Sequence, residues 1–458
     1  MDIARSRFRV DGNNTSKPTK NIFGLSGNQL DFVQERVESD VRFIGFAVKK
    51  ASATGAPIQS LYLYTSMLGE GGYGSVYAAK RSDQPDDVNF TVKRFSNQEV
   101  RVGDVVSEID RFANVREKRP FLDPTVQDRL DPYSKIYETR AVEREWRILQ
   151  LVISRASLFP APVARICRNQ IVCAIDRFYT PNLSHGFVVF EGFANAQTLY
   201  AVARRTWYEE FKQLDAAPVA ARTRTRELSL SLVRNARLRA LSVARTVVQT
   251  VAYLHKMHIY HRDINPNNVL VRETADGLVE ARVIDFGLAC AEPLPGTYNT
   301  DYQRDERFVA CSDQFVTTYD YEDPLIAMLP EDPRYQSLIS GYPDDKLARE
   351  TLQKLGDSFA VGKTLQMIFD YQTYDAARRT WVAPVTRETT AMPAGYFDII
   401  RALTGESANE TPTEDFKLTA EEFAQRFRRI ERRLTPGEVL FDLERLIRNF
   451  LESSEQQN

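Results

Sequence analysis

The chain has 458 residues, of which 43% are hydrophobic, and 60 basic and 62 acidic residues give it a formal net charge of −2. This length exceeds one typical core and predicts two or more lobes with extensions, and the hydrophobic content excludes a disordered chain. The balanced, scattered charge does not indicate a nucleic acid or an anionic membrane surface, so we expect neither as a partner.

Four cysteines stand at positions 167, 173, 290 and 311. Their spacing fits no zinc pattern, and they are too few for a disulfide framework in a chain of this size. We therefore expect reduced thiols and an intracellular protein, cytoplasmic or nuclear. The first 25 residues are polar without an apolar core, and no apolar run approaches the roughly 20 residues that span a bilayer, so we expect a soluble chain.

Strand patterns precede helical patterns along the chain. The expected elements are a loose tail over 1–25, one or two strands within 26–58, three strands over 60–95, a charged insertion at about 96–140, a helix over 141–153, strands near 171–172 and 187–190, a second insertion at about 205–230, and helices over 236–256, 355–369 and 419–452. This order predicts an α+β chain with two lobes.

A glycine-rich run lies between the first two of the three strands. It reads Gly69-Glu70-Gly71-Gly72-Tyr73-Gly74-Ser75-Val76. A dinucleotide-binding fingerprint of this kind should open a helix, whereas strand-forming residues follow here. The run therefore predicts a hairpin whose glycines let backbone N–H groups approach phosphate oxygens.

Lys93 stands on the third strand, 19 residues after Gly74. A single lysine in a strand is usually a solvated edge residue, but its place after the glycine hairpin indicates a phosphate ligand. Such a lysine needs an anionic partner, and the helix over 141–153 offers Glu145 or, as an alternative, Glu143.

Residues 259 to 289 carry the densest group of polar signals. They contain His261-Arg262-Asp263, Asn268 and Asp285-Phe286-Gly287. Two carboxylates and an amide at this spacing suit the positioning of a hydroxyl, one or two Mg²⁺ ions and a triphosphate.

These motifs, in this order, resemble those of the eukaryotic protein kinase family over roughly residues 60 to 370. The resemblance implies a two-lobed fold with a small β-rich lobe at 59–192 and a larger helical lobe at 193–458, after a partly disordered extension at 1–58. It implies a protein kinase that uses ATP and Mg²⁺ and transfers the γ-phosphate to serine or threonine hydroxyls of protein substrates.

The resemblance also assigns roles to residues. Asp263 would be the catalytic base, and Lys93 would hold phosphates with Glu145 as its partner. Asn268 and Asp285 would bind Mg²⁺. Adenine would lie between Val76 and Leu270, with backbone groups of Glu191 and Phe193 at its edge. Asp357 would brace the catalytic loop, and Arg262 would pair with a phosphate in the activation segment.

Three departures from the family pattern stand out. Asn265 replaces the lysine that serine/threonine kinases carry two residues after the base. Leu325 replaces a glutamate that normally forms a buried ion pair, which is therefore missing or rebuilt. Residues 370–458 match no known pattern. Thr318, at the position of the serine/threonine-kinase threonine, favours those hydroxyls.

The departures leave alternatives open. The chain could be a pseudokinase or a nucleotide-binding scaffold that transfers phosphate weakly or not at all, or a tyrosine or dual-specificity kinase. Its divergence would suit a viral or effector protein acting in a host cell. The substrate and the oligomeric state do not follow from the sequence.

Overall fold

The structure is a computed structural model, and it divides into two compact units that are described separately. It describes residues 33–37, 43–50, 58–71, 74–81, 89–96, 131–179, 185–203, 224–274, 278–295, 300–311, 321, 323, 326, 345–369, 374–375, 380–381, 392–405 and 420–455. One unit comprises Met1–Gln150 and Val172–Ala194, and the other Leu151–Ile171 and Asn195–Asn458. The first is rich in strands and the second in helices, so the α+β class is confirmed. The predicted lobe bounds, 59–192 and 193–458, stay predictions.

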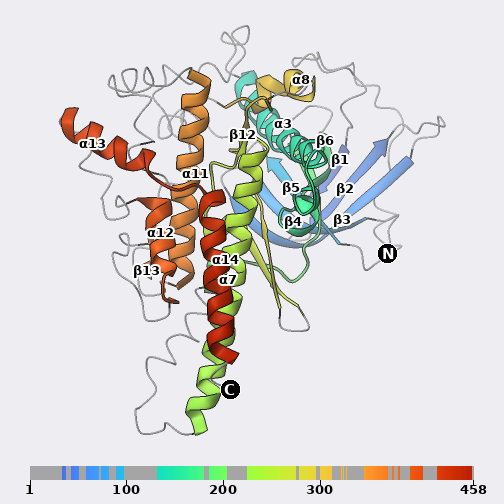
Figure 1. Ribbon diagram of the computed structural model, residues 1–458. Coiled ribbons are helices and arrows are strands. Elements are labelled where there is room, and N and C mark those ends of the chain that lie inside the picture. The colour runs from blue at the N-terminus through green and yellow to red at the C-terminus, as the bar shows by residue number, and fades with distance from the viewer. Residues whose placement is uncertain are drawn as a thin grey trace. The chain divides into compact units, whose positions relative to one another are not determined.

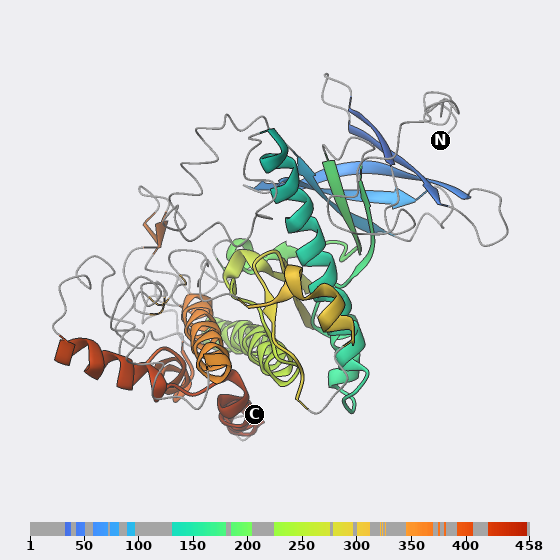
Figure 2. The ribbon, with the colours of Figure 1, turned by 90° about the horizontal axis from the view of Figure 1, so that it is seen from above.

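The first unit is built on a seven-stranded antiparallel sheet (Figures 1 and 2). Its order is β1-β2-β3-β4-β5-β7-β6. The strands are β1 Val33–Val37, β2 Phe43–Lys50, β3 Ile58–Gly71, β4 Gly74–Arg81, β5 Phe90–Ser96, β6 Ala174–Tyr179 and β7 His185–Glu191. The strands expected within 26–58 are confirmed as β1 and β2, which extend the sheet beyond β3.

Alternation of side chains builds the core of this sheet. In β4, Ser75, Tyr77 and Ala79 are buried, while the residues between them are half-buried. This period of two places every second side chain on one face. Tyr62 of β3 meets Phe90 of β5 edge-to-face, with ring centroids 5.8 Å apart. This aromatic contact therefore links β3 and β5 across the strand between them, β4.

Helix α3, Asp131–Ala156, is longer than the predicted 141–153. Its residues up to 140 lie in the stretch that the sequence indicated as an insertion, because that stretch is highly charged and carries Pro120, Pro124 and Pro132. Pro132 is the second residue of the helix, where a missing N–H breaks no helical hydrogen bond. The last residues of α3, from Leu151, belong to the second unit.

The second unit is mainly helical. Its helices are η4 Val163–Arg165, α4 Ile166–Asn169, α5 Leu199–Val202, α7 Arg224–Lys256, η6 Pro266–Asn268, α8 Thr300–Val309, α11 Asp345–Phe369, α12 Tyr396–Thr404, α13 Ala420–Glu431 and α14 Pro436–Glu455. Short strands form three small sheets, from β8 Gln197–Thr198, β9 Ile259–Tyr260, β10 Val269–Glu273, β11 Val279–Val283, β12 Cys290–Ala291, β13 Tyr374–Asp375 and β14 Thr380–Trp381. Among the described helices, none has the length and apolarity to cross a bilayer.

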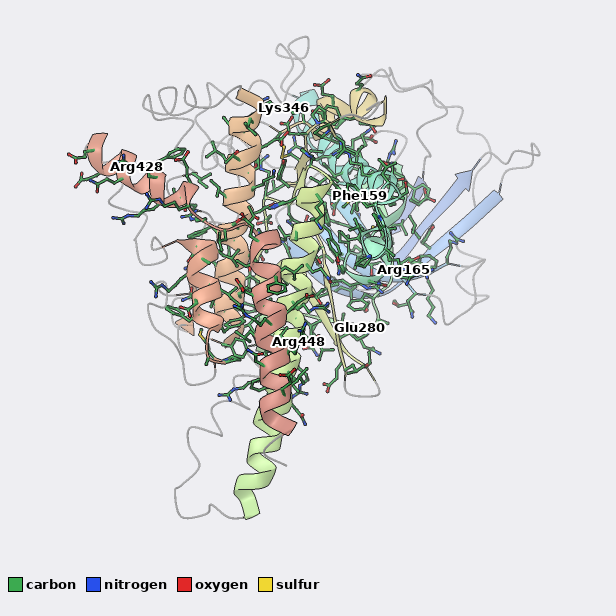
Figure 3. All side chains as sticks on the ribbon, in the orientation of Figure 1. Phe159, Arg165, Glu280, Lys346, Arg428 and Arg448 are labelled. Atoms are coloured by element: carbon green, nitrogen blue, oxygen red, sulfur yellow. A yellow bond between two sulfur atoms is a disulfide. The ribbon has the colours of Figure 1, made fainter. Side chains whose placement is uncertain are left out.

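Helix α7 is the centre of this unit, and α14 runs along it (Figure 1). Its buried positions recur with a helical period: Ala240, Leu241, Ala244, Val247, Val248 and Val251 are all fully buried. The helix starts at Arg224, inside the second predicted insertion, because charged and polar residues there continue a helix rather than interrupt it. Figure 3 draws the side chains as sticks and labels, among others, Glu280 on β11 and Arg448 on α14.

The predicted C-terminal helix over 419–452 is two helices, α13 and α14. Pro436 is the first residue of α14, where its ring suits a helix start. The Glu438 carboxylate reaches back and accepts a hydrogen bond from the Thr435 backbone N–H at 2.7 Å. This is one half of a capping box, and it fixes the break between the two helices.

All four cysteines lie in the described part of the chain and are disulfide-bonded, so the expectation of reduced thiols is wrong. Cys290 of β12 is bonded to Cys311, just after α8. Beside this bond, Ala291 and Ala310 form a parallel β-bridge. Sequence spacing did not reveal the pair, because the fold returns the chain to β12 only after a helix.

Reduction should destabilise the chain. A disulfide that closes a loop of 21 residues is expected to stabilise the fold by about 3 kcal/mol. The double substitution Cys290→Ser/Cys311→Ser should therefore lower the unfolding midpoint, as measured by circular dichroism, and a reductant should then add only the effect of the remaining cysteines. Thiol titration of the denatured, unreduced protein should find no free thiol, and a count of four would contradict the pairing.

Candidate active site

Three of the predicted nucleotide-binding residues of the first unit, Gly69, Val76 and Lys93, lie in one row across its sheet. Gly69 is opposite Val76, Val76 is opposite Lys93, Lys93 is opposite Val188, and Val188 is opposite Arg177. Directly opposed residues in antiparallel strands project from the same face. Gly69, Val76 and Lys93 therefore share a face of the sheet.

The glycine run forms a strand–turn–strand hairpin and not the start of a helix. β3 and β4 pair through Glu70–Ser75 and end at Gly71 opposite Gly74. Gly72 and Tyr73, at the tip, lie outside the described residues. Gly74 has φ +142°, and a Cβ there would lie 2.0 Å from the Arg94 carbonyl oxygen. Both the backbone conformation and the close approach require glycine.

Of the two glutamates that the sequence left open, Glu145 is the partner of Lys93. The Lys93 ammonium donates a hydrogen bond to Glu145 Oε2 at 2.9 Å. The lysine side chain is 12% exposed and the glutamate side chain 1%. Glu143 instead accepts a hydrogen bond from Arg147 Nε at 2.6 Å. A pair so well excluded from water holds its geometry tightly, because separating it would leave a buried charge unpaired.

The segment after β7 makes a close turn. Phe190 and Phe193 are buried, and Glu191 between them is exposed. Gly192 donates its N–H to the Asn89 carbonyl at 2.9 Å, and a Cβ on Gly192 would lie 2.7 Å from the same group. The sequence interpretation did not single out Gly192, although this contact excludes any side chain there.

In the second unit, Leu270 is half-buried on β10, opposite Thr198 of β8. Thr198 caps α5, since its hydroxyl accepts a hydrogen bond from the Ala201 N–H at 3.2 Å. The strand that carries Leu270 is therefore fixed from both sides, by β8 and β11.

Two amides hold the carboxylate of Asp263. Asn268 Nδ2 donates to Asp263 Oδ2 at 2.8 Å, and Asn265 Nδ2 donates to Oδ1 at 3.1 Å. The other end of the Asn265 amide accepts a hydrogen bond from the Asn267 N–H at 2.9 Å. Asn265 thus orients the carboxylate and starts the turn that carries Asn268, although it brings no positive charge.

Asp357 of α11 anchors the loop that contains Asp263. Its fully buried carboxylate accepts hydrogen bonds from the backbone N–H groups of His261 at 2.9 Å and Arg262 at 2.7 Å. It also contacts His255 Nε2 of α7 at 3.0 Å. Burial acts to raise the pKa of Asp357, but the hydrogen bond and charge of His255, with His261 and the Arg262 N–H, outweigh it and hold the pKa below its ordinary value.

The backbone is strained at two residues close to the Asp357 contacts. Arg262 and Asp285 adopt left-handed conformations, with φ of 66° and 64°. For residues other than glycine this costs about 1–2 kcal/mol each. The hydrogen bond from the Arg262 N–H to Asp357 offsets the cost at the first position, and the bond from the Gly287 N–H to Asp285 Oδ1, at 3.2 Å, acts at the second.

The His261 side chain contacts both the turn at Asp263 and the turn at Asp285. Its ring packs on Phe286 with centroids 4.7 Å apart, and its Nε2 lies 3.2 Å from the Ile284 carbonyl oxygen. Its Nδ1 accepts a hydrogen bond from the Asp263 N–H at 3.3 Å. Burial lowers the pKa of His261 although three carboxylates oppose the shift. Both contacts suit a neutral ring that carries its proton on Nε2.

Asn268 and Asp285 form a suitable pair of donors for Mg²⁺. The Ile284 N–H donates to the Asn268 carbonyl at 2.9 Å, which places Asp285 next to the Asn268 turn. Because Asn268 Nδ2 faces Asp263, its amide oxygen faces away and remains a hard oxygen donor. The described residues contain no cluster of three His, Cys, Asp or Glu side chains able to hold a metal. A carboxylate and an amide fit an ion that completes its shell with phosphate oxygens and water.

A buried ion pair in the second unit joins two residues that are far apart in the sequence. Asp323 and Arg433 form a salt bridge with both side chains almost completely buried. Asp323 Oδ1 also accepts a hydrogen bond from the Ile326 N–H at 3.0 Å, and the Arg433 guanidinium lies 5.1 Å from the centre of the Phe359 ring. No sequence motif pointed to Arg433, which is 110 residues from Asp323. Thr318 and Leu325 lie outside the described residues.

Comparison with known proteins points to one family. Residues 220–324 match the family model of the protein kinase domain. The chain is 38% identical over 66 residues to the serine/threonine-protein kinase ksp1 of Schizosaccharomyces pombe, covering 14% of this chain and 14% of that protein. It is 32% identical over 79 residues to mitogen-activated protein kinase 3 of Oryza sativa subsp. japonica, covering 16% and 20%.

The matched segments thus span at most a fifth of the length of these two relatives. Among solved structures, the chain is similar to the ROP18 kinase domain in complex with AMP-PNP and sucrose. That match has a TM-score of 0.43 and 15% identity, and it covers 89% of this chain and 86% of the other.

Acid should destabilise the chain through His261. Its pKa is below the ordinary value in the folded state, so the unfolded chain binds the proton first as the pH falls through about 6.5. The free energy of unfolding should therefore fall between pH 7 and 5.5, by up to about 1.4 kcal/mol per pH unit for this one group. Denaturant titrations of the wild type and His261→Asn should converge at low pH, and parallel curves would contradict the assignment.

Loss of the Asp323 carboxylate should leave Arg433 buried without its partner. Asp323→Ala should lower the free energy of unfolding by about 3–5 kcal/mol. Adding Arg433→Leu should restore part of that stability, because the unpaired charge is then gone. A double-mutant cycle in urea measures the coupling, and additive effects of the two substitutions would show that the side chains do not interact.

Proposed function

We propose that the chain is a protein kinase of the eukaryotic protein kinase family, which uses ATP and Mg²⁺ and transfers the γ-phosphate to serine or threonine hydroxyls of protein substrates. The match of residues 220–324 to the protein kinase domain supports this proposal. The observation that carries the proposal is the held carboxylate of Asp263, oriented by Asn265 and Asn268 on a loop that Asp357 anchors. This is the arrangement a base needs to meet an incoming hydroxyl.

Asp263 accepts the proton of the attacking hydroxyl and orients its oxygen. The two amide donors fix both carboxylate oxygens, so the side chain does not have to reorganise when the substrate arrives. Because protein-kinase catalysis is mainly positioning and charge stabilisation, this fixed orientation is a direct contribution to the rate.

Lys93 would hold the α- and β-phosphates, and Glu145 keeps its ammonium in place on the sheet. Val76, in the same row, and Leu270 would contact adenine. Asn268 and Asp285 would hold Mg²⁺, which neutralises phosphate charge when bound.

Asn265 makes this site unusual among protein kinases. The lysine that it replaces would meet the γ-phosphate, and the loss of such a charge-assisted contact costs about 1.5–3 kcal/mol. We therefore expect a slow kinase, with a rate one to two decades below that of a site with the lysine. The same residue supports the alternative of a pseudokinase that binds nucleotide without transfer.

The substrate hydroxyl follows from weaker signals. Thr318 occupies the position of the serine/threonine-kinase threonine, and the ksp1 relative is named a serine/threonine-protein kinase. A tyrosine or dual-specificity kinase is the alternative, and phosphoamino-acid analysis separates the three.

The disulfides indicate the redox environment in which the chain folds. Disulfides form and persist in oxidising compartments and are rare in the reducing cytosol. With all four cysteines bonded, we propose an oxidising environment during folding, in place of the intracellular location that reduced cysteines had suggested.

Transfer of label from γ-labelled ATP to a generic protein substrate tests the function. The wild type should transfer label to serine or threonine, and Asp263→Asn and Lys93→Met should each reduce the rate by at least about a thousandfold. Asp398→Asn, on the exposed side of α12, is the matched control and should leave the rate unchanged.

Two outcomes would overturn the proposal. If Lys93→Met and Asp263→Asn both retain the wild-type rate, the site lies elsewhere. If nucleotide stabilises the wild type against heat but no label is transferred, the chain is a nucleotide-binding pseudokinase.

A further inference from the structure

Helix α3 carries a second buried carboxylate, Glu143, which the transfer chemistry does not use. Its side chain is fully buried. Arg147, one turn along the helix, donates to its Oε2 at 2.6 Å, and Arg177 Nε of β6 lies 2.8 Å from its Oε1. The Glu143 carboxylate thus contacts two guanidinium groups, one from α3 itself (Arg147) and one from the sheet (Arg177).

The two glutamates of α3 face opposite sides of the helix. Residues two apart are about 200° apart around an α-helix. Glu145 reaches Lys93 on β5, and Glu143 reaches Arg177 on β6. Lys93 and Arg177 are both opposite Val188 of β7, so they flank it in one row of the sheet. The two residues therefore lie two strands apart, with their backbones about 10 Å from each other, and each forms an ion pair with a different side of the helix.

Arg177 is itself held in place. Its side chain is 14% exposed, and its guanidinium lies 5.3 Å from the centre of the Trp146 ring on α3. The helix contacts the arginine through an aromatic face and a carboxylate together. Because Arg177 contacts both Trp146 and Glu143, moving α3 along the sheet or away from it would disrupt both contacts.

We propose that Arg177 and Glu143 are positioning residues, which hold α3 at the rotation that brings Glu145 to Lys93. The inference rests on the proposed kinase function, since it concerns the regulation of that site. In protein kinases the ion pair between this lysine and this glutamate must be in place, and the position of its helix controls it. Here rotation of α3 about its axis would break two buried ion pairs at once.

A helix that is held from both sides by ion pairs does not need a partner protein to set its rotation. The chain by itself should therefore keep Lys93 and Glu145 paired, with or without nucleotide.

Reactivity of Lys93 tests the inference without any catalysis. Only the neutral amine attacks an amine-reactive reagent, so a lysine paired with a buried carboxylate reacts slowly. The full chain, without nucleotide, is treated briefly with such a reagent, and labelling of Lys93 is read by mass spectrometry. Glu145→Gln supplies the rate for an unpaired Lys93.

Arg177→Met should raise the labelling rate of Lys93 at least fivefold, toward that of Glu145→Gln. Arg177→Lys, which keeps the charge, should restore most of the protection. Arg245→Met, which breaks the exposed Arg245–Glu444 ion pair, is the matched control and should label Lys93 at the wild-type rate. If Arg177→Met does not fold, by circular dichroism, then Glu143→Gln gives the same comparison with the shape of the side chain kept.

Kinetics provide the second readout. Arg177→Met should raise KM for ATP at least tenfold with Lys93 and Glu145 intact. Wild-type labelling of Lys93 in folded Arg177→Met or Glu143→Gln would overturn the inference, even if the wild-type chain transfers phosphate. If the wild type does not transfer phosphate, the function fails, but the labelling rates still decide whether α3 is held in this way.

Discussion

One buried carboxylate, that of Asp357, sets the geometry of the loop that carries Asp263. It lies on α11, accepts two backbone N–H groups from the loop and contacts His255 of α7, so three elements meet at a single charged group. The hydrogen bonds are strong because the acceptor is ionised and no water competes. They allow Arg262 to keep its left-handed backbone conformation, and this conformation directs the next residue, Asp263, toward its amide partners. Asp357 thus supports the chemistry although its own carboxylate faces the protein interior.

The first unit follows the same principle with ion pairs. A row of opposed residues across its sheet carries Val76, Lys93 and Arg177. Two carboxylates of α3 meet the two cations. Buried ion pairs add little net stability, because desolvation offsets attraction, but breaking one partner is costly. In our proposal these pairs define one rotation of α3, the one in which Glu145 meets Lys93.

Contacts between residues of recognised motifs were predictable from the sequence, whereas contacts outside those motifs were not. Lys93 and Glu145 are 52 residues apart, yet their places in the motifs led to a pair that the structure contains. Arg177 and Arg433 gave no signal, because no motif contains them and only the fold brings each to its carboxylate. The charge and prolines of 96–140 misled the prediction of α3, since a proline such as Pro132 marks either a break or a first turn and the sequence does not say which. The disulfides were missed for the same reason as the arginines.

The most direct test of this account is a crystal structure of the full chain with a non-hydrolysable ATP analogue and Mg²⁺. The account predicts the Lys93 ammonium on the α- and β-phosphates, still paired with Glu145, the metal on Asp285 and Asn268, and Asp263 facing the γ-phosphate. Nucleotide bound elsewhere, or Lys93, Asp263 and Asp285 on separate surfaces, would contradict it.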